Sequence, residues 1–252
     1  MLRLWPKRWQ LGIFNDHSWL CHGNQKVAEI NDVSLDIYSS FEQLLAASKH
    51  VLKKNDRLSM TLSDAFFRIV TLPWQDNLNT AAELNAYAKI CFAMQGVVLD
   101  ESWVIFSDFI RYNQPGIAYA LKKDSVERLI TIAKAAHVSI ENIQPKSASV
   151  FYAVQRKKWN ETRLLILLEK DRVSSFVYGQ NGLLGCDVEV LTSKKDISVR
   201  RLLTRVQLDR QIKRVSCWST SEVISETNLK ALFQDFFADD NVQFAQSQTE
   251  RY

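Results

Sequence analysis

Three potential metal ligands lie close together near the start of the 252-residue chain: His17, Cys21 and His22. Histidine and cysteine are the usual ligands of zinc, and three of them can hold a catalytic ion. Side chains on a β-strand alternate between two faces, so positions 17 and 21 share one face while position 22 points to the other. The three side chains therefore cannot converge from this segment alone. We expect no metal site and no cofactor.

Patterns that indicate catalysis are weak elsewhere. No serine lies in a Gly-x-Ser-x-Gly elbow, and the sequence does not place a cysteine and a histidine as nucleophile and base. Nucleases of the ribonuclease-H type need a metal-binding aspartate on their first strand. Leu11, Ile13 and Phe14 occupy that strand here, whereas Asp16 lies in a turn and Asp64 follows the fourth predicted strand. A nuclease is thus a weak alternative, and we assign no catalytic residue.

Glycine is scarce, with seven residues in the whole chain. Loops that cradle phosphate use glycine because backbone N–H groups must approach the phosphate closely, often through positive φ angles. The composition therefore predicts few such loops.

A basic segment extends from Lys194 to Arg214 and includes Arg201 and Arg205. A basic helical face could bind phosphates, acidic lipid or an acidic partner. The interpretation we favour is a solvated face whose arginines pair with nearby carboxylates, and we keep Arg201 and Arg205 as candidate partner-binding residues. Nucleic-acid binding is a third hypothesis, weakened because no aromatic residue interrupts this helix.

Two tryptophan-containing segments have two interpretations each. Trp74, next to Pro73, is either a core anchor, which we favour, or part of a docking groove, since tryptophan is enriched in both places. Trp5 and Trp9 lie among basic residues and could rest at a membrane interface or against a partner. In the simpler interpretation Trp9 begins the first strand.

Composition indicates a cytoplasmic globular protein. Hydrophobic residues make up 46% of the chain, and the longest aliphatic run, 164–168, is far too short to cross a bilayer. The basic N-terminus has Pro6 and further charges where a signal peptide would be apolar. The four cysteines lie far apart, which predicts buried free thiols. The net charge of +4 does not by itself demand an anionic partner.

Periodicity predicts one strand–strand–strand–helix–strand unit used twice. In the first half the predicted strands are 8–14, 18–22, 26–30 and 57–62, with an amphipathic helix over 41–52 capped by Ser39 or Ser40. In the second half they are 163–169, 172–178, 183–191 and 213–218, with a helix from Asp196 to about Ile212. We therefore expect an α/β fold with two lobes.

The two copies are separated by further elements. Predicted strands at 65–72, 102–109, 116–122 and 138–143 alternate with helices at 79–94 and from about 124 to 136. We predict lobe I over 1–157, with an inserted small α+β subdomain over about 76–144, and lobe II over 158–252.

This order of elements resembles the actin-like, duplicated ribonuclease-H-like fold, and in particular the cytoplasmic adaptors of type IV pilus and type II secretion platforms, the PilM and GspL-like group. The most telling string reads LSDAFFRIVTLPW from Leu62 to Trp74 and is followed by Glu83 and Tyr87. The strand, proline and small-residue helix around Pro145 are also similar to the joint that enters the second lobe in that group. The resemblance makes Arg68 and Trp74 candidate partner-binding residues.

The chain departs from the nucleotide-binding members of this fold. Those members hold an aspartate near the end of the first strand of each hairpin and a glycine in the turn. Phe14 stands at that aspartate here and Asp16 at that glycine, while Cys21 replaces a phosphate-facing lysine. In the second hairpin we place Leu168 at the aspartate and Lys170 in the glycine region. Both phosphate loops are thus expected to be degenerate.

The resemblance implies a non-enzymatic scaffold or adaptor in a bacterial secretion or type IV pilus-like assembly at the cytoplasmic face of the inner membrane. Because no segment can span the membrane, a separate protein partner would bring the chain to the platform, and a homodimer is left open. The alternative is a kinase-like or ATPase-like nucleotide binder of the same fold.

Overall fold

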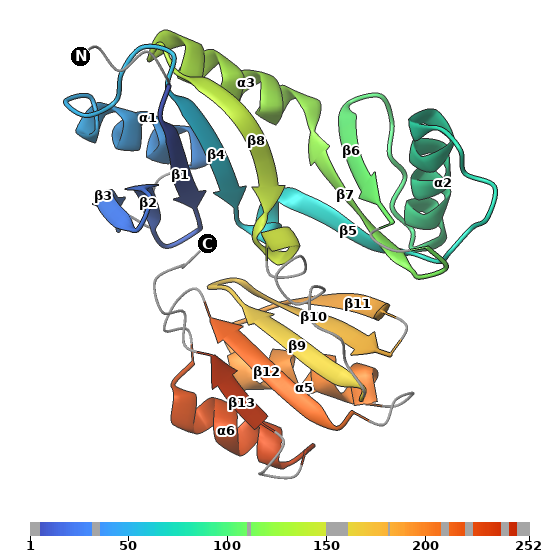
Figure 1. Cartoon of the computed structure of the whole chain (residues 1–252). Coiled ribbons are helices and arrows are strands. Elements are labelled where there is room, and N and C mark those ends of the chain that lie inside the picture. The colour runs from blue at the N-terminus through green and yellow to red at the C-terminus, as the bar shows by residue number, and fades with distance from the viewer. Residues whose placement is uncertain are drawn as a thin grey trace. The chain divides into compact units, whose positions relative to one another are not determined.

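The computed structural model of the chain (Figure 1) describes residues 6–31, 36–109, 112–149, 161–180, 182–207, 212–219, 224–237 and 242–245. The chain divides into two compact units. The first comprises residues 1–67 and 121–150 with 250–252, and the second comprises residues 68–120 and 151–249. The predicted boundary between lobes, near residue 157, lies outside the described residues, so the predicted domain limits stay a prediction.

The first unit is built on a mixed five-stranded sheet. Its strands are β1 (Arg8–Ile13), β2 (Ser18–His22), β3 (Gln25–Ile30), β4 (Arg57–Leu62) and β8 (Ser139–Pro145), in the order β3-β2-β1-β4-β8. The first three strands form an antiparallel meander, and β4 and β8 continue the sheet in parallel with β1. Helices α1 (Ile37–Ala47) and α3 (Lys123–Ala135) contact each other and pack against this sheet.

A second five-stranded sheet repeats this topology. Its strands are β9 (Arg163–Leu168), β10 (Arg172–Gly179), β11 (Gly182–Val190), β12 (Arg214–Ser219) and β13 (Val242–Ala245), in the order β11-β10-β9-β12-β13. Strand directions match those of the first sheet pair by pair. Helices α5 (Lys195–Gln207) and α6 (Glu226–Gln234) complete the copy. The predicted duplication and α/β class are confirmed.

A small third sheet with one helix follows β4. After the 3₁₀ turn η1 (Asp64–Phe66), strands β5 (Phe67–Leu72), β6 (Trp103–Asp108) and β7 (Gly116–Lys122) pair in the order β5-β7-β6. Helix α2 (Ala81–Met94) packs on this sheet around a core that includes Val70, Leu72, Cys91 and Phe92. We refer to α2 and these three strands as the inserted subdomain.

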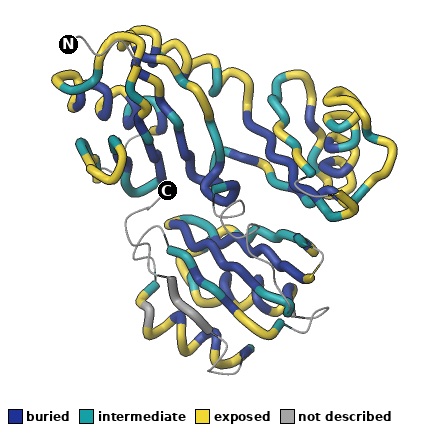
Figure 2. Tube along the Cα trace, in the orientation of Figure 1, coloured by how far each residue is buried: buried dark blue, intermediate teal, exposed yellow. Residues whose placement is uncertain are grey.

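Burial follows the sheets. Figure 2 shows β1, β4, β9 and β10 in dark blue and most of the outward helix surfaces in yellow. The strand β9 is buried along nearly its whole length because its sheet is the centre of a cluster with Val199, Leu202 and Phe233 from α5 and α6. Apolar strand residues at the middle of each sheet thus supply the core of each copy.

The beginning of α1 differs from the prediction. The helix starts at Ile37, and Asp36 caps it by accepting hydrogen bonds from the backbone N–H groups of Tyr38 and Ser39 at 2.9 and 2.7 Å. These bonds, the one from Ser39 above all, lower the pKa of the Asp36 carboxyl. Ser39 and Ser40 lie inside the first turn, so the expectation that one of them is the cap was wrong. A carboxylate is the better acceptor at a helix N-terminus because it also interacts favourably with the helix dipole.

Candidate functional site

The first hairpin turn, between β1 and β2, is filled by side chains. The backbone N–H of Phe14 donates to the carbonyl of His17 at 2.9 Å, which closes a tight four-residue turn. The Phe14 ring is buried and stacks on the His17 ring, with centroids 4.8 Å apart. His17 Nδ1 lies 2.6 Å from Asp16 Oδ1, and Lys146 Nζ lies 6.0 Å from the Phe14 centroid. Stacked rings and the contact between His17 and Asp16 therefore occupy this turn, at the positions where the sequence analysis expected an aspartate and a glycine to be replaced.

The glycine of strand β1 has a packing role. A Cβ added to Gly12 would lie 2.4 Å from Cε2 of Trp19, on the neighbouring strand, and Trp19 is buried. The indole ring thus lies directly on the Gly12 backbone. Gly12 therefore leaves the space that the Trp19 ring occupies.

His17, Cys21 and His22 lie in different surroundings, and His17 belongs to the turn that precedes β2. His17 stacks on Phe14, whereas the His22 ring packs against Trp9 with centroids 4.9 Å apart. Cys21 precedes His22 in β2 and is half-buried. Within the residues that the structure describes, no group of three histidine, cysteine, aspartate or glutamate side chains is arranged to hold a metal ion.

The register of the second hairpin corrects one prediction. Ile13 pairs with Ser18 across the first turn and Leu168 pairs with Val173 across the second, and each turn contains four residues. The Glu169 N–H donates to the Arg172 carbonyl at 2.9 Å, as Phe14 does in the first turn. Leu168 is therefore the counterpart of Ile13, and the counterpart of Phe14 is the buried carboxylate Glu169, at 3% exposure. Counting back from a distant turn missed this residue because it shifted the register by one.

The Ser63-Asp64 pair forms a joint between two distant segments. Ser63 Oγ accepts the Ala65 N–H and caps η1. Asp64 is buried and accepts both the backbone N–H of Ser147, at 3.0 Å, and its hydroxyl, at 2.8 Å. Because Ser147 lies in the helical turn that starts at Lys146, this carboxylate caps a helix from another part of the chain. In the string from Leu62 to Trp74, Ser63 and Asp64 therefore have a structural role as helix-capping residues.

The two candidate partner-binding residues that follow lie in different settings. Arg68 is exposed and makes no hydrogen bond or ion pair with any described residue. Trp74 is half-buried; its Nε1–H donates to Asp76 at 2.8 Å, and its ring meets Phe109 and Tyr112 edge-on at 5.1 Å. Tyr112 is 83% exposed, so this aromatic group reaches the surface. Whether Arg68 and Trp74 bind a partner stays a prediction.

Arg201 and Arg205 are paired with carboxylates of β11. Arg205 donates to Asp187 at 2.8 and 3.2 Å and to Glu189 at 2.8 Å, and these bonds raise the pKa of its guanidinium. Arg201 lies 3.4 Å from Glu189. This arrangement matches the paired helix face that we favoured, and partner binding by these two arginines stays a prediction.

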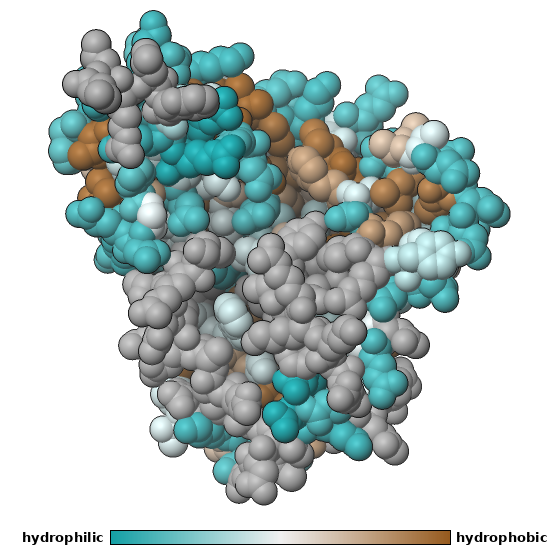
Figure 3. Space-filling view, viewed as in Figure 1, coloured by the Kyte–Doolittle hydropathy of each residue, from teal (hydrophilic) through white to brown (hydrophobic). Residues whose placement is uncertain are grey.

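The outer face of α2 carries large exposed apolar side chains beside Glu83, Asn85 and Lys89, and the sequence analysis missed them. Ile90 is 58% exposed and Met94 82%, and Val98, just beyond the helix, is 84% exposed. Ala82, Ala86 and Ala93 are also exposed on this helix. In the view of Figure 3, brown hydrophobic atoms reach the surface over the inserted subdomain. The signal in the sequence is that α2 holds more apolar residues than the buried set of Ala88, Cys91 and Phe92 accounts for.

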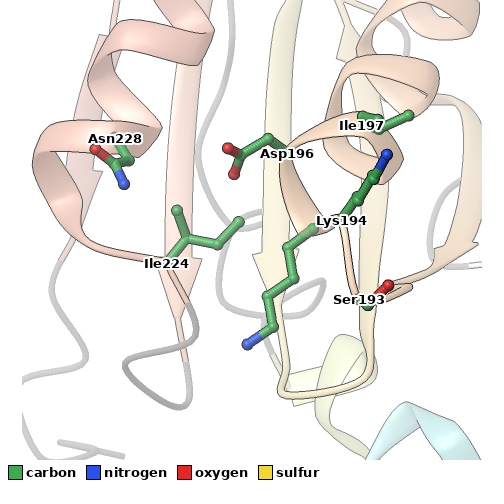
Figure 4. Close-up of a pocket in the computed structure, with 7 residues that line it drawn as sticks. Ser193, Lys194, Asp196, Ile197, Ile224 and Asn228 are labelled. Atoms are coloured by element: carbon green, nitrogen blue, oxygen red, sulfur yellow. The ribbon is translucent and has the colours of Figure 1, made fainter.

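An open depression of about 420 Å³ lies between the N-terminus of α5 and the start of α6 (Figure 4). Lys194, Asp196 and Ile197 line it from one side, and Ile224 and Asn228 from the other, with Asp196 pointing toward α6. A helix N-terminus alone does not define a binding site, and we assign no ligand to this depression.

No family model matches the sequence, and no curated protein matches it. Several solved structures match the fold of this chain. A Bacteroides thetaiotaomicron protein with an actin-like ATPase fold and unknown function matches with a TM-score of 0.67 at 13% identity, over 95% of this chain and 90% of that one. The chain has the actin-like fold.

Two further neighbours come from a pilus biogenesis complex and from a secretion system. The PilM-PilN type IV pilus biogenesis complex matches with a TM-score of 0.66 at 10% identity, over 95% of this chain and 88% of the other. The cytoplasmic domain of EpsL, an inner membrane component of the Vibrio cholerae type II secretion system, matches with a TM-score of 0.52 at 7% identity, over 98% and 87%. The fold predicted from the resemblance is confirmed, and these are the neighbours that it indicated. Among the described residues, no helix is both long and apolar enough to cross a bilayer.

Proposed function

We propose that this chain is a non-enzymatic scaffold or adaptor of the actin-like fold in a bacterial secretion or type IV pilus-like assembly, at the cytoplasmic face of the inner membrane. Its fold neighbours include a pilus biogenesis complex and a secretion-system component. The filled first hairpin, with Phe14 buried against His17, supports a role without nucleotide chemistry.

The outer face of α2 is the observation that carries this proposal. The inner face already supplies the core of the inserted subdomain through Ala88, Cys91 and Phe92. Exposed Ile90, Met94 and Val98 therefore add nothing to that core, and large apolar side chains left in water favour association with another surface. An amphipathic or apolar segment of a partner would bury them as a groove-bound helix does. We assign this face as the docking surface of the adaptor.

A pull-down from native membranes of the source organism tests the proposal. The wild-type chain should recover components of a pilus or secretion platform, and Ile90→Glu/Met94→Glu should lose them, because burying two new carboxylates without partners opposes docking. The matched control is Val190→Glu/Ile197→Glu, which changes two similarly exposed apolar residues, at 61% and 47%, elsewhere. Recovery of no platform component, or equal losses for both variants, would refute the assignment.

Nucleotide binding is the second candidate function, and Glu169 favours it. This buried carboxylate stands in the second hairpin at the position equivalent to Phe14 in the first, where relatives of this fold place a metal-binding acid. A real site at 100 times its dissociation constant adds about 2.7 kcal/mol of stability. Thermal unfolding with ATP and Mg²⁺ should show such a shift only if this candidate is right, and Glu169→Gln should then remove the shift.

A further inference from the structure

One end of the first unit brings three segments of the chain together. Arg57 N–H donates to the Lys7 carbonyl at 2.8 Å, Asn55 N–H to the His137 carbonyl at 2.9 Å, and Ser139 N–H to the Asp56 carbonyl at 2.9 Å. The entry to β1, the loop after α1 and the loop after α3 therefore form one surface, at the end of the first sheet where the parallel strands β1, β4 and β8 begin (Figure 1).

This surface is strongly basic. Its cations, which together we call the basic edge, are Lys7, Arg8, Lys49, Lys53, Lys54, Arg57 and Lys134. All but the half-buried Lys7 are exposed. The same segments hold two carboxylates, Asp56 and Glu141, so the formal charge of this end is +5, whereas the whole chain carries +4. This end of the first unit thus carries an excess of positive charge.

The two carboxylates leave most of these cations unneutralised. Asp56 is 2% exposed and points inward, accepting the N–H groups of Lys7 and Lys53 at 2.9 and 3.0 Å and the indole N–H of Trp9 at 2.9 Å. Glu141 pairs with Arg8 at 3.1 Å and approaches Arg57 at 3.6 Å. Lys7 Nζ lies 5.8 Å from the centroid of the Trp9 ring. The other four cations, Lys49, Lys53, Lys54 and Lys134, form no ion pair with any described residue. Asp56 thus fixes the loop that presents the lysines to solvent.

We propose that the basic edge binds directly to the surface of an anionic phospholipid bilayer. Clustered lysines gain affinity from the negative potential of such a surface. Single-stranded nucleic acid fits less well, because Trp9 is 2% exposed and no Phe, Tyr or Trp is exposed for base stacking in the described part of the edge. This inference does not depend on the adaptor role.

Vesicle co-sedimentation of the purified full chain tests the proposal. The protein should partition onto vesicles containing phosphatidylglycerol and not onto phosphatidylcholine vesicles, and 0.5 M NaCl should abolish the binding through screening. Lys53→Gln/Lys54→Gln should weaken partition about 25-fold, from roughly fivefold for each lysine. The matched control, Lys89→Gln/Lys123→Gln, removes the same charge from α2 and from the opposite end of α3 and should change partition less than twofold.

Three outcomes would overturn the proposal. Equal partition onto anionic and neutral vesicles would show that charge does not direct binding. Equal losses of vesicle binding for the two double variants would show that the net charge of the protein, and not the basic edge, determines the binding. Tighter, edge-dependent binding to a DNA or RNA duplex at the same salt would make nucleic acid the partner. Circular dichroism of each variant checks that the fold is intact. The vesicle assay uses the purified chain alone, so its result is independent of whether the pull-down recovers a platform component.

Discussion

The contact between Gly12 and Trp19 predicts that Gly12→Ala destabilises the protein when residue 19 is tryptophan and stabilises it when residue 19 is leucine. In Gly12→Ala the new methyl group would lie 2.4 Å from the buried indole ring, about 1 Å closer than an ordinary contact. Overpacking of a core costs about 1–3 kcal/mol, while replacing glycine stabilises by about 0.4–1 kcal/mol through the unfolded chain. The net expectation is a loss of about 1–2 kcal/mol. Trp19→Leu alone should cost about 2–4 kcal/mol because it leaves a cavity.

The double variant decides whether the ring is responsible. Once Trp19 is leucine, the space beside position 12 is open, so Gly12→Ala should stabilise by about 0.4–1 kcal/mol and the coupling energy should be about 2 kcal/mol. Urea unfolding followed by circular dichroism measures all four proteins without relying on tryptophan fluorescence. If Gly12→Ala destabilises the Trp19→Leu protein as much as the wild type, the packing explanation for this glycine is wrong.

Three further predictions follow from the described contacts. Asp64→Ala should lower the unfolding free energy by about 2–3 kcal/mol, because the Ser147 amide and hydroxyl both lose a buried acceptor; a loss no larger than that of Ser147→Ala would contradict this role. Burial raises the pKa of the Cys217 thiol to about 12, so a thiol reagent at pH 8 should modify it far more slowly in the native protein than half-buried Cys186, and equal rates would be the contrary result. Burial raises the pKa of Tyr87 to about 12, so the folded state holds this proton more tightly than the unfolded state, in which the pKa is near 10. The resulting stability is present below pH 10 and is lost as the pH rises to 12; unfolding of Tyr87→Phe should lack this component, and identical pH profiles would contradict it.

The sequence predicted the sheets well because each strand carries its own signal. The alternation in 8–14 and 18–22, and the turn pairs between strands, depend on neighbouring residues alone, and β1 and β2 formed where expected. The repeat of the second half was readable for the same reason. The N-cap of α1 was missed because an aspartate just before an apolar periodic run and two serines within it are all acceptable caps by type.

The candidate sites were harder to predict because they depend on register and exposure. Glu169 became the counterpart of Phe14 only when strand pairing aligned the two turns. The pairing of Arg205 with Asp187 joins residues from a helix and a strand, which the sequence alone does not place side by side. The exposed face of α2 was overlooked because apolar residues in a helix are usually assigned to a core, and only the structure shows which of them the core leaves out.

The position of the inserted subdomain between β4 and β8 bears on how the first sheet folds. The first sheet is incomplete until β8 pairs with β4, and the subdomain separates these two strands in sequence. Bringing distant segments together costs entropy that grows with the length of the intervening loop. Because β5 directly follows η1 and pairs with β7, which leads straight into α3, folding of the subdomain joins the two ends of its own segment. A subdomain that folds first would therefore shorten the effective loop and speed the closing of the first sheet, while an unfolded one would leave the β4 edge exposed to pairing with other chains.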